Sequence, residues 1–260
     1  SLTSIEIPNS VKSMGDYVFN YCTSLTNVNI PNDVTSIGDG AFAGCFSFTN
    51  ITIPDSITSI GDDAFMECKN LTSIKIPNSV TRIGCEAFYG CTKLTRVYIT
   101  DVERWCKIDF GDTSANPLTY AHNLYLNYGL VTDLVIPDSV TSIKYTFSGC
   151  KNLTSIKIPS SVTSICDDAF YNCSSLKSVT IPNSVTTIGS RAFLDCSSLT
   201  NVTIPNNVTS IGEFAFSGCS SLKSVTIPDN VTSIGEFAFF GCDEVKFVYY
   251  RGTEAEKFYI

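Results

Sequence analysis

A repeat of about 23 residues, which runs through nearly the whole chain, constrains its fold more than any other feature. The prolines mark the period, because Pro8, Pro31, Pro54 and Pro77 are evenly spaced. The stretch LTSIKIPNSVTRIGCEAFYGC shows the pattern L-x-x-I-x-I-P-x-x-V-T-x-I-G-x-x-A-F-x-x-C in full. A fixed period of roughly 20 to 50 residues is the signature of stacked coils rather than of a globule.

The repeat predicts one array of about eleven coils over residues 1–260. The coils begin at residues 2, 25, 48, 71, 94, 131, 153, 176, 199, 222 and 245. The coil of residues 94–130 carries an insertion, and the next one, residues 131–152, is one residue shorter than the rest. A single coil buries too little apolar surface to fold alone, so neighbouring coils must cover it. The final residues, 245–260, resemble the start of the long coil and are expected to form a C-terminal capping unit.

Each coil contains signals for two short strands. The segment L-x-x-I-x-I alternates apolar and polar residues, which is typical of a half-buried strand. The proline ends that strand, because it cannot donate to a central ladder. V-T-x-I then forms a second extended piece, and the glycine permits a tight turn. The segment x-x-A-F-x-x-C is expected to be a helical turn that presents Ala, Phe and Cys to the core.

These residues resemble the BspA-like leucine-rich repeat family, a bacterial-surface type also found in treponemes. The resemblance covers essentially the whole chain. It implies a leucine-rich-repeat solenoid that is horseshoe-like and mostly β, with short helical turns and a parallel sheet on its concave face. It also implies an extracellular or cell-surface location and a role in adhesion to host proteins or to other cells. No family motif fixes the binding residues.

The charge pattern excludes several classes of partner. The chain has 25 acidic and 17 basic residues, a net charge of -8, and no run of Lys or Arg, so nucleic acid is disfavoured. No stretch approaches the roughly 18 consecutive apolar residues that would predict a membrane span. The chain begins inside a repeat, so we expect any export signal or anchor to lie outside this fragment.

The cysteines follow the repeat and predict packing rather than chemistry. Nine of the 12 share the position after A-F: Cys22, Cys45, Cys68, Cys91, Cys150, Cys173, Cys196, Cys219 and Cys242. We expect a ladder of buried thiols, although adjacent coils about 4.8 Å apart lie within disulfide reach. There is no C-x-x-C pair and no Cys/His cluster, so neither a metal nor a cofactor is expected.

The sequence also argues against an enzyme. His122 is the only histidine, and no general acid, base or nucleophile partner can be identified for it from spacing. The acidic pairs Asp62/Asp63 and Asp167/Asp168 fall in the turn before A-F, where a capping role is expected.

The long coil, residues 94–130, departs from the pattern after its strand. Asp101 is a candidate N-cap for a short helix whose apolar face would be Val102, Trp105 and Cys106. We expect Trp105 to fill the core of this irregular coil. A turn-rich loop, DFGDTSANP, follows, and residues 127–129 are expected to turn a β-hairpin.

The binding candidates are aromatic and basic. Most outward strand positions carry small polar residues, and in the body of the array only Arg96 and Tyr98 are of the kinds that anchor interfaces. The insertion adds Tyr120, His122, Tyr125 and Tyr128, which either plug the core or form a contact surface. The expected function is a non-enzymatic adhesion module that contacts a host or neighbouring-cell protein or glycan. The alternative is a rigid spacer that presents another domain.

Overall fold

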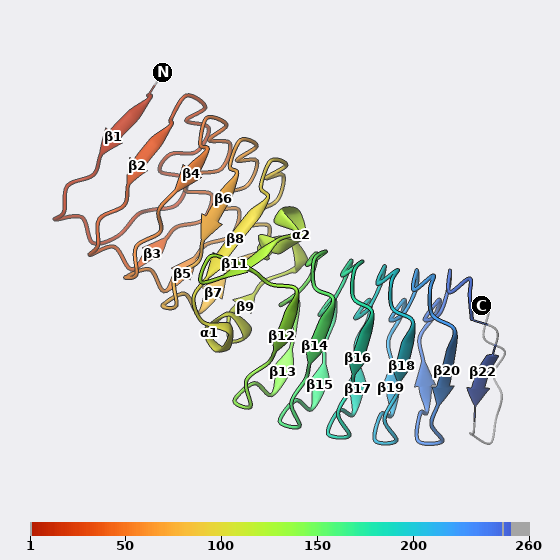
Figure 1. Ribbon diagram of the computed structural model, residues 1–260. Coiled ribbons are helices and arrows are strands. Elements are labelled where there is room, and N and C mark those ends of the chain that lie inside the picture. Colours follow the sequence, from red (N-terminus) through yellow and green to blue (C-terminus); the bar gives the residue numbers. More distant parts are fainter. Residues whose placement is uncertain (1, 246, 251–260) are drawn as a thin grey trace. The chain divides into compact units, whose positions relative to one another are not determined.

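The computed structural model describes residues 2–245 and 247–250. The chain forms two compact units, residues 1–130 (unit 1) and residues 131–260 (unit 2). Each unit is a stack of coils whose short strands lie side by side (Figure 1). The fold is the predicted leucine-rich-repeat solenoid, mostly β and with parallel pairing from coil to coil.

In unit 1, the L-x-x-I-x-I strands form what we call the front sheet, and the V-T-x-I strands form the second sheet. The front strands are β1 (Ser4–Glu6), β2 (Asn27–Asn29), β4 (Asn50–Ile51), β6 (Ser73–Lys75), β8 (Arg96–Ile99), β10 (Leu124–Leu126) and β11 (Gly129–Leu130). The second strands are β3 (Ser36–Ile37), β5 (Ser59–Ile60), β7 (Arg82–Ile83) and β9 (Asp109–Phe110). β1 pairs with β2, and the larger part of the front sheet has the order β11-β10-β8-β6-β4.

Unit 2 repeats the same two ladders. Its front strands are β12 (Asp133–Val135), β14 (Ser155–Lys157), β16 (Ser178–Thr180), β18 (Asn201–Thr203), β20 (Ser224–Ile227) and β22 (Phe247–Tyr250). Its second strands are β13 (Ser142–Ile143), β15 (Ser164–Ile165), β17 (Thr187–Ile188), β19 (Ser210–Ile211) and β21 (Ser233–Ile234). β22 pairs in parallel with β20, whereas residues 251–260 of the expected capping unit lie outside the described residues.

The pairing register reproduces the period of the sequence. Val179 pairs with Val202, the equivalent residue one full repeat later, whereas Leu134 pairs with Ile156 across the one shortened coil. The side chains of a front strand alternate as predicted: in β16, Val179 is buried and its two neighbours are exposed. The repeat length therefore fixes which side chains stack on each face.

In the core, equivalent side chains of successive coils stack on one another in ladders. In unit 2, Phe193 stacks between Phe170 and Phe216, with ring centroids 5.2 and 5.1 Å away. Beside them, the Cys196 thiol donates to the carbonyl oxygen of Phe170, with 3.2 Å between Sγ and O. All 12 cysteines are free thiols, and the repeat positions from Cys45 onward are buried. The sulfur thus satisfies a carbonyl that faces the core.

The A-F segments are single turns and not continuous helices. Cys45 N–H donates to the Phe42 carbonyl, three residues back, whereas Phe42 N–H donates to Ala64 of the following coil. Carboxylates contribute to the same stacking, because Asp62 Oδ1 accepts from the backbone N–H of Cys85 in the next coil. The acidic turn residue therefore caps the neighbouring coil rather than a helix of its own.

Candidate functional site

The structure departs from the repeat where the long coil replaces the proline turn with a helix. Helix α1 (Val102–Cys106) lies where the sequence predicts one, and the Asp101 carboxylate accepts from the backbone N–H of Arg104 at 3.1 Å. Trp105 is 1 % exposed and lies edge-on to Phe110, with ring centroids 5.2 Å apart. The expectation that Trp105 fills the core is confirmed.

The remainder of the insertion keeps both sheets intact. Strand β9 extends the second sheet, because Phe110 pairs with Ile83 of β7. The 3-10 helix η1 (Thr113–Ala115) and helix α2 (Leu118–Ala121) then occupy the place of the A-F turn. The sequence predicts only a loop for residues 109–117, because their Gly, Asp, Ser, Asn and Pro residues suit turns and caps equally well.

The insertion ends in a hairpin that adds two strands to the front sheet. β10 pairs in parallel with β8, and β11 folds back antiparallel onto β10. The turn consists of Asn127 and Tyr128, whose φ values of 49° and 68° are both positive. Positive φ at both central residues is the mark of a type I′ turn, which matches the twist of a tight hairpin.

Three of the predicted binding residues come together where this hairpin pairs with β8, and we call them the tyrosine platform: Tyr98, Tyr125 and Tyr128. Tyr98 and Tyr125 are direct neighbours in the β8–β10 pairing, with ring centroids 5.1 Å apart. The Tyr128 ring lies 5.8 Å from that of Tyr98 and is 79 % exposed. The sequence offers Tyr98, Tyr125 and Tyr128 among the candidates for one contact surface, and the β8–β10 pairing brings these three residues together.

The other three candidates lie around the platform or away from it. Arg96 is exposed on β8, two residues before Tyr98 on the same face. Tyr120 is on α2, hydrogen-bonded to the Ser114 side chain, and its partial burial raises the pKa of its phenol. His122 is the C-cap of α2, with a φ of 62°. The six candidates therefore do not form a single cluster.

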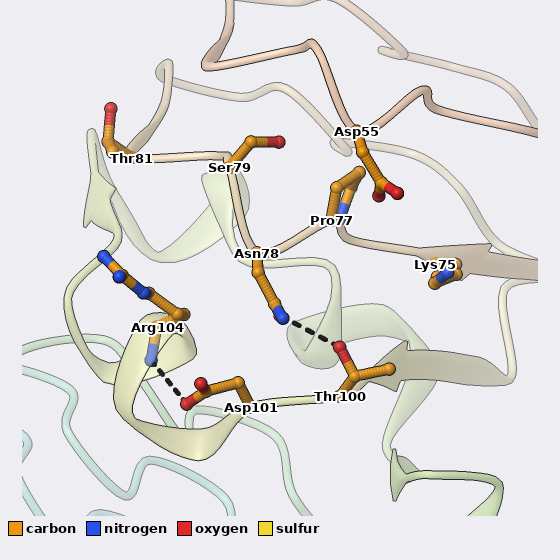
Figure 2. Close-up of a pocket in the computed structure, with 9 residues that line it drawn as sticks. All are labelled: Asp55, Lys75, Pro77, Asn78, Ser79, Thr81, Thr100, Asp101 and Arg104. Carbon is orange, nitrogen blue, oxygen red and sulfur yellow. Dashed lines mark hydrogen bonds between the residues drawn. The ribbon is translucent and has the colours of Figure 1, made fainter.

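A polar cleft lies beside the platform, and sequence reasoning did not find it. It has a volume of about 660 Å³ and is lined by Asp55, Lys75, Pro77, Asn78, Ser79, Thr81, Thr100, Asp101 and Arg104. Figure 2 shows Asp55 and Lys75 on one side of the view and Asp101 and Arg104 on the other. One feature of the sequence could have indicated the cleft: T-D follows β8 where other coils have P-N, so helix α1 replaces the usual proline turn there.

The cleft carries a balanced set of charges. Thr100 Oγ1 donates to Asn78 Oδ1 at 3.0 Å, which holds the two coils together at its base. Asp101 is engaged in capping α1, whereas Asp55 and Lys75 are exposed and make no ion pair within the described residues. The lining of the cleft thus includes two carboxylates, Asp55 and Asp101, and two cationic side chains, Lys75 and Arg104.

Lys75 connects the cleft to the platform. It lines the cleft and is the direct neighbour of Tyr98 in the β6–β8 pairing. Unit 2 contains an internal comparison, because TSIKIP occurs at residues 72–77 and again at 154–159. There the equivalent Lys157 has Thr180 as its neighbour and no tyrosine beside it. The site therefore arises from the insertion and not from the repeat itself.

In the described part of the chain, a metal site would require a cluster of ligand side chains, and a membrane span would require a long apolar helix. No group of three or more His, Cys, Asp or Glu side chains there could hold a metal ion. Among the same residues, no helix has the length and apolarity needed to cross a bilayer.

Comparisons with known proteins agree with this architecture. The model of the BspA type leucine rich repeat region matches residues 1–113 and 120–246, in six copies. No curated protein sequence matches the chain.

Solved structures add bacterial relatives. A leucine rich cell surface protein from Faecalibacterium prausnitzii is 28% identical, with a TM-score of 0.64 over 97% of this chain and 80% of its own. A leucine-rich repeat protein from Eubacterium ventriosum is 25% identical, with a TM-score of 0.54 over 98% of this chain and 84% of its own. The pneumococcal vaccine antigen PcpA shares the fold at 19% identity, with a TM-score of 0.64 over 97% of this chain and 69% of its own. With the family model matched along both units, the chain belongs to the BspA-type leucine-rich repeat family.

Proposed function

We propose that this chain is a non-enzymatic binding module, exposed at a cell surface, that contacts a protein or glycan of a host or neighbouring cell. Membership of the BspA-type family supports a binding role, and the F. prausnitzii relative, described as a cell surface protein, supports the location. The contact surface we propose is the front sheet together with the insertion.

The tyrosine platform is the observation that carries this proposal. Tyrosines anchor interfaces well, because each presents a large amphipathic ring and loses few rotatable bonds on binding. Tyr128 keeps 79 % of its surface exposed although a buried aromatic ring would stabilise the fold. The ring is also held on a residue with positive φ, which costs about 1 kcal/mol in a non-glycine residue. An exposed tyrosine ring beside two others supports contact with a partner.

The direct test is binding of the purified chain to immobilised matrix proteins, mucins and glycans. Replacing the platform with Tyr98→Ser and Tyr128→Gly is expected to weaken any binding by at least about tenfold, since anchor residues contribute about 2 kcal/mol or more. Tyr21→Gly is the matched control, because Tyr21 is 66 % exposed, has positive φ and lies outside the platform.

Two outcomes would contradict the proposal. One is the absence of binding to every class of immobilised partner. The other is equal binding by the wild-type chain and the platform variant, which would mean that the partner contacts another surface.

A rigid spacer is the second candidate, and the front face of unit 2 favours it. Its outward positions there are mostly small and polar, for example Ser178, Thr180, Asn201 and Thr203. Such residues supply no interface anchors. For a spacer, deleting coil 176–198 from the intact surface protein should shorten its reach, and the platform variants should leave cell attachment unchanged.

A further inference from the structure

We infer that the tyrosine platform and the polar cleft together form one binding site for a neutral oligosaccharide. This inference rests on the proposed binding function and names the class of ligand for it. It follows from the chemistry of the two surfaces and from the residue that joins them, Lys75.

The platform suits the apolar face of a sugar ring. A pyranose presents several C–H groups on one face, and these pack on the flat, electron-rich face of an aromatic ring, which attracts positively polarised groups. Tyr98 and Tyr125 lie at 37° to one another and Tyr98 and Tyr128 at 50°, so the three rings form a faceted rather than a flat surface. Their phenol groups add hydrogen-bonding positions at the rim.

The cleft suits the hydroxyl groups of the next sugar. The carboxylates of Asp55 and Asp101 can accept hydrogen bonds, the cations of Lys75 and Arg104 can donate them, and Asn78 offers an amide. Hydrogen bonds to charged groups are stronger than those between neutral groups. A polyhydroxyl compound is the ligand class that uses donors and acceptors in such equal measure.

The balance of charge favours a neutral ligand over an acidic one. Two carboxylates offset two cations in the cleft, and the chain as a whole carries a net charge of -8. A polyanionic glycan would therefore be repelled on approach and would gain no net attraction in the cleft. Arg96, exposed two residues before Tyr98 on β8, adds a cation on the platform side.

The geometry places the two surfaces in reach of one chain of sugars. Lys75 and Tyr98 are register neighbours on adjacent strands, which lie about 4.8 Å apart. The cleft volume of about 660 Å³ falls within the roughly 300–1,000 Å³ of small-ligand sites. Its lining is polar, however, whereas sites for apolar ligands are lined by hydrophobic side chains. A protein partner could bind to the platform alone, so a protein ligand would not explain the presence of the cleft.

Gel retardation of the whole chain tests the inference. Native gels are cast with galactomannan, β-glucan, xylan or polygalacturonate, and the last of these is the acidic comparison. We expect at least one of the neutral polysaccharides to slow migration. Lys75→Ala and Tyr98→Ser should each weaken that retardation by about tenfold or more, since each removes a charged hydrogen bond or a stacked ring.

The repeat supplies matched controls. Lys157 in unit 2 occupies the same repeat position as Lys75 in unit 1, and Asp138 the same position as Asp55. Lys157→Ala and Asp138→Ala should therefore leave retardation unchanged, in contrast to Lys75→Ala and Asp55→Ala. Thermal melting of every variant checks folding, and Tyr98→Phe, which keeps the ring, should retain most of the retardation.

The outcomes separate this inference from the proposed function. Retardation by polygalacturonate alone, or binding to proteins with no retardation by any neutral polysaccharide, would overturn the inference and leave the binding function standing. Equal loss in the Lys75→Ala and Lys157→Ala variants would also overturn it. If neither proteins nor mucins nor glycans bind, both proposals fail.

Discussion

The buried thiol ladder makes stability depend on pH in a way that can be calculated. Burial raises the pKa of the Cys196 thiol well above its usual range, and the neighbouring Cys173 thiol acts in the same direction. In the unfolded chain the pKa of a cysteine is about 8.5. Above that pH the unfolded state loses a proton that the folded state keeps, so folding stability must fall as pH rises.

Replacing Cys196 by alanine isolates this contribution. At pH 7.5 the substitution removes a buried sulfur and its bond to the Phe170 carbonyl, which is expected to cost about 1.5 kcal/mol. At pH 10 the ionisation of this one thiol in the unfolded state accounts for about 2 kcal/mol of the stability that the wild-type chain has lost. The destabilisation by Cys196→Ala should therefore fall by about 2 kcal/mol between these pH values and end close to zero.

The measurement is urea unfolding of both chains at each pH, followed by circular dichroism with a reductant present. Taking the difference between the two chains cancels the tyrosines and lysines that also titrate near pH 10. Cys166→Ala serves as the control, because Cys166 is only partly buried and lies outside the ladder. A destabilisation by Cys196→Ala that stays constant across the pH range would refute the buried, protonated ladder.

Four further substitutions test other parts of the structure by urea unfolding. Phe193→Ala, in the middle of the stacked ring ladder, should lower the free energy of unfolding by about 3–5 kcal/mol. Phe237 is 47 % exposed, so Phe237→Ala should lower it by less than about 1 kcal/mol. Similar losses in the two variants would contradict the packing. Asp101→Ala removes the cap of α1 and should lower the free energy of unfolding by about 1 kcal/mol. An unchanged free energy would mean that the cap does not stabilise the fold. Tyr128→Gly should stabilise the chain by about 1 kcal/mol by relieving positive φ, and destabilisation would show that the ring packs against the fold.

The repeat could be predicted from the sequence, because its period equals the residue spacing between paired strands of neighbouring coils. Apolar residues at fixed positions predict both strands of each coil, and the shortened coil appears as the shifted pairing of Leu134 with Ile156. Local signals also predict helix α1 and the burial of Trp105: Asp101 is a helix cap, and Trp105 lies on the apolar face of the helix. Local patterns repeated many times leave little freedom for the fold.

The site was only partly readable, because it depends on pairing between distant residues. The sequence singles out Tyr98, Tyr125 and Tyr128 as aromatic residues, but their meeting depends on β10 pairing with β8 across the insertion. The sequence groups Tyr120 with them because it is one of the aromatic residues of the insertion, whereas helix α2 places it beside Ser114. The cleft could not be predicted because its lining comes from three neighbouring coils and depends on helix α1 standing in place of the proline turn.

The most direct test of the account is amide hydrogen exchange of the whole chain, measured with and without the neutral polysaccharide that retards it most. Bound ligand should slow exchange in residues 75–78, 96–104 and 124–130, which carry the cleft and the tyrosine platform. The equivalent residues of unit 2, including 157–160, should be unaffected. Protection confined to unit 2, or spread evenly over every front strand, would contradict the claim that the insertion makes the binding site.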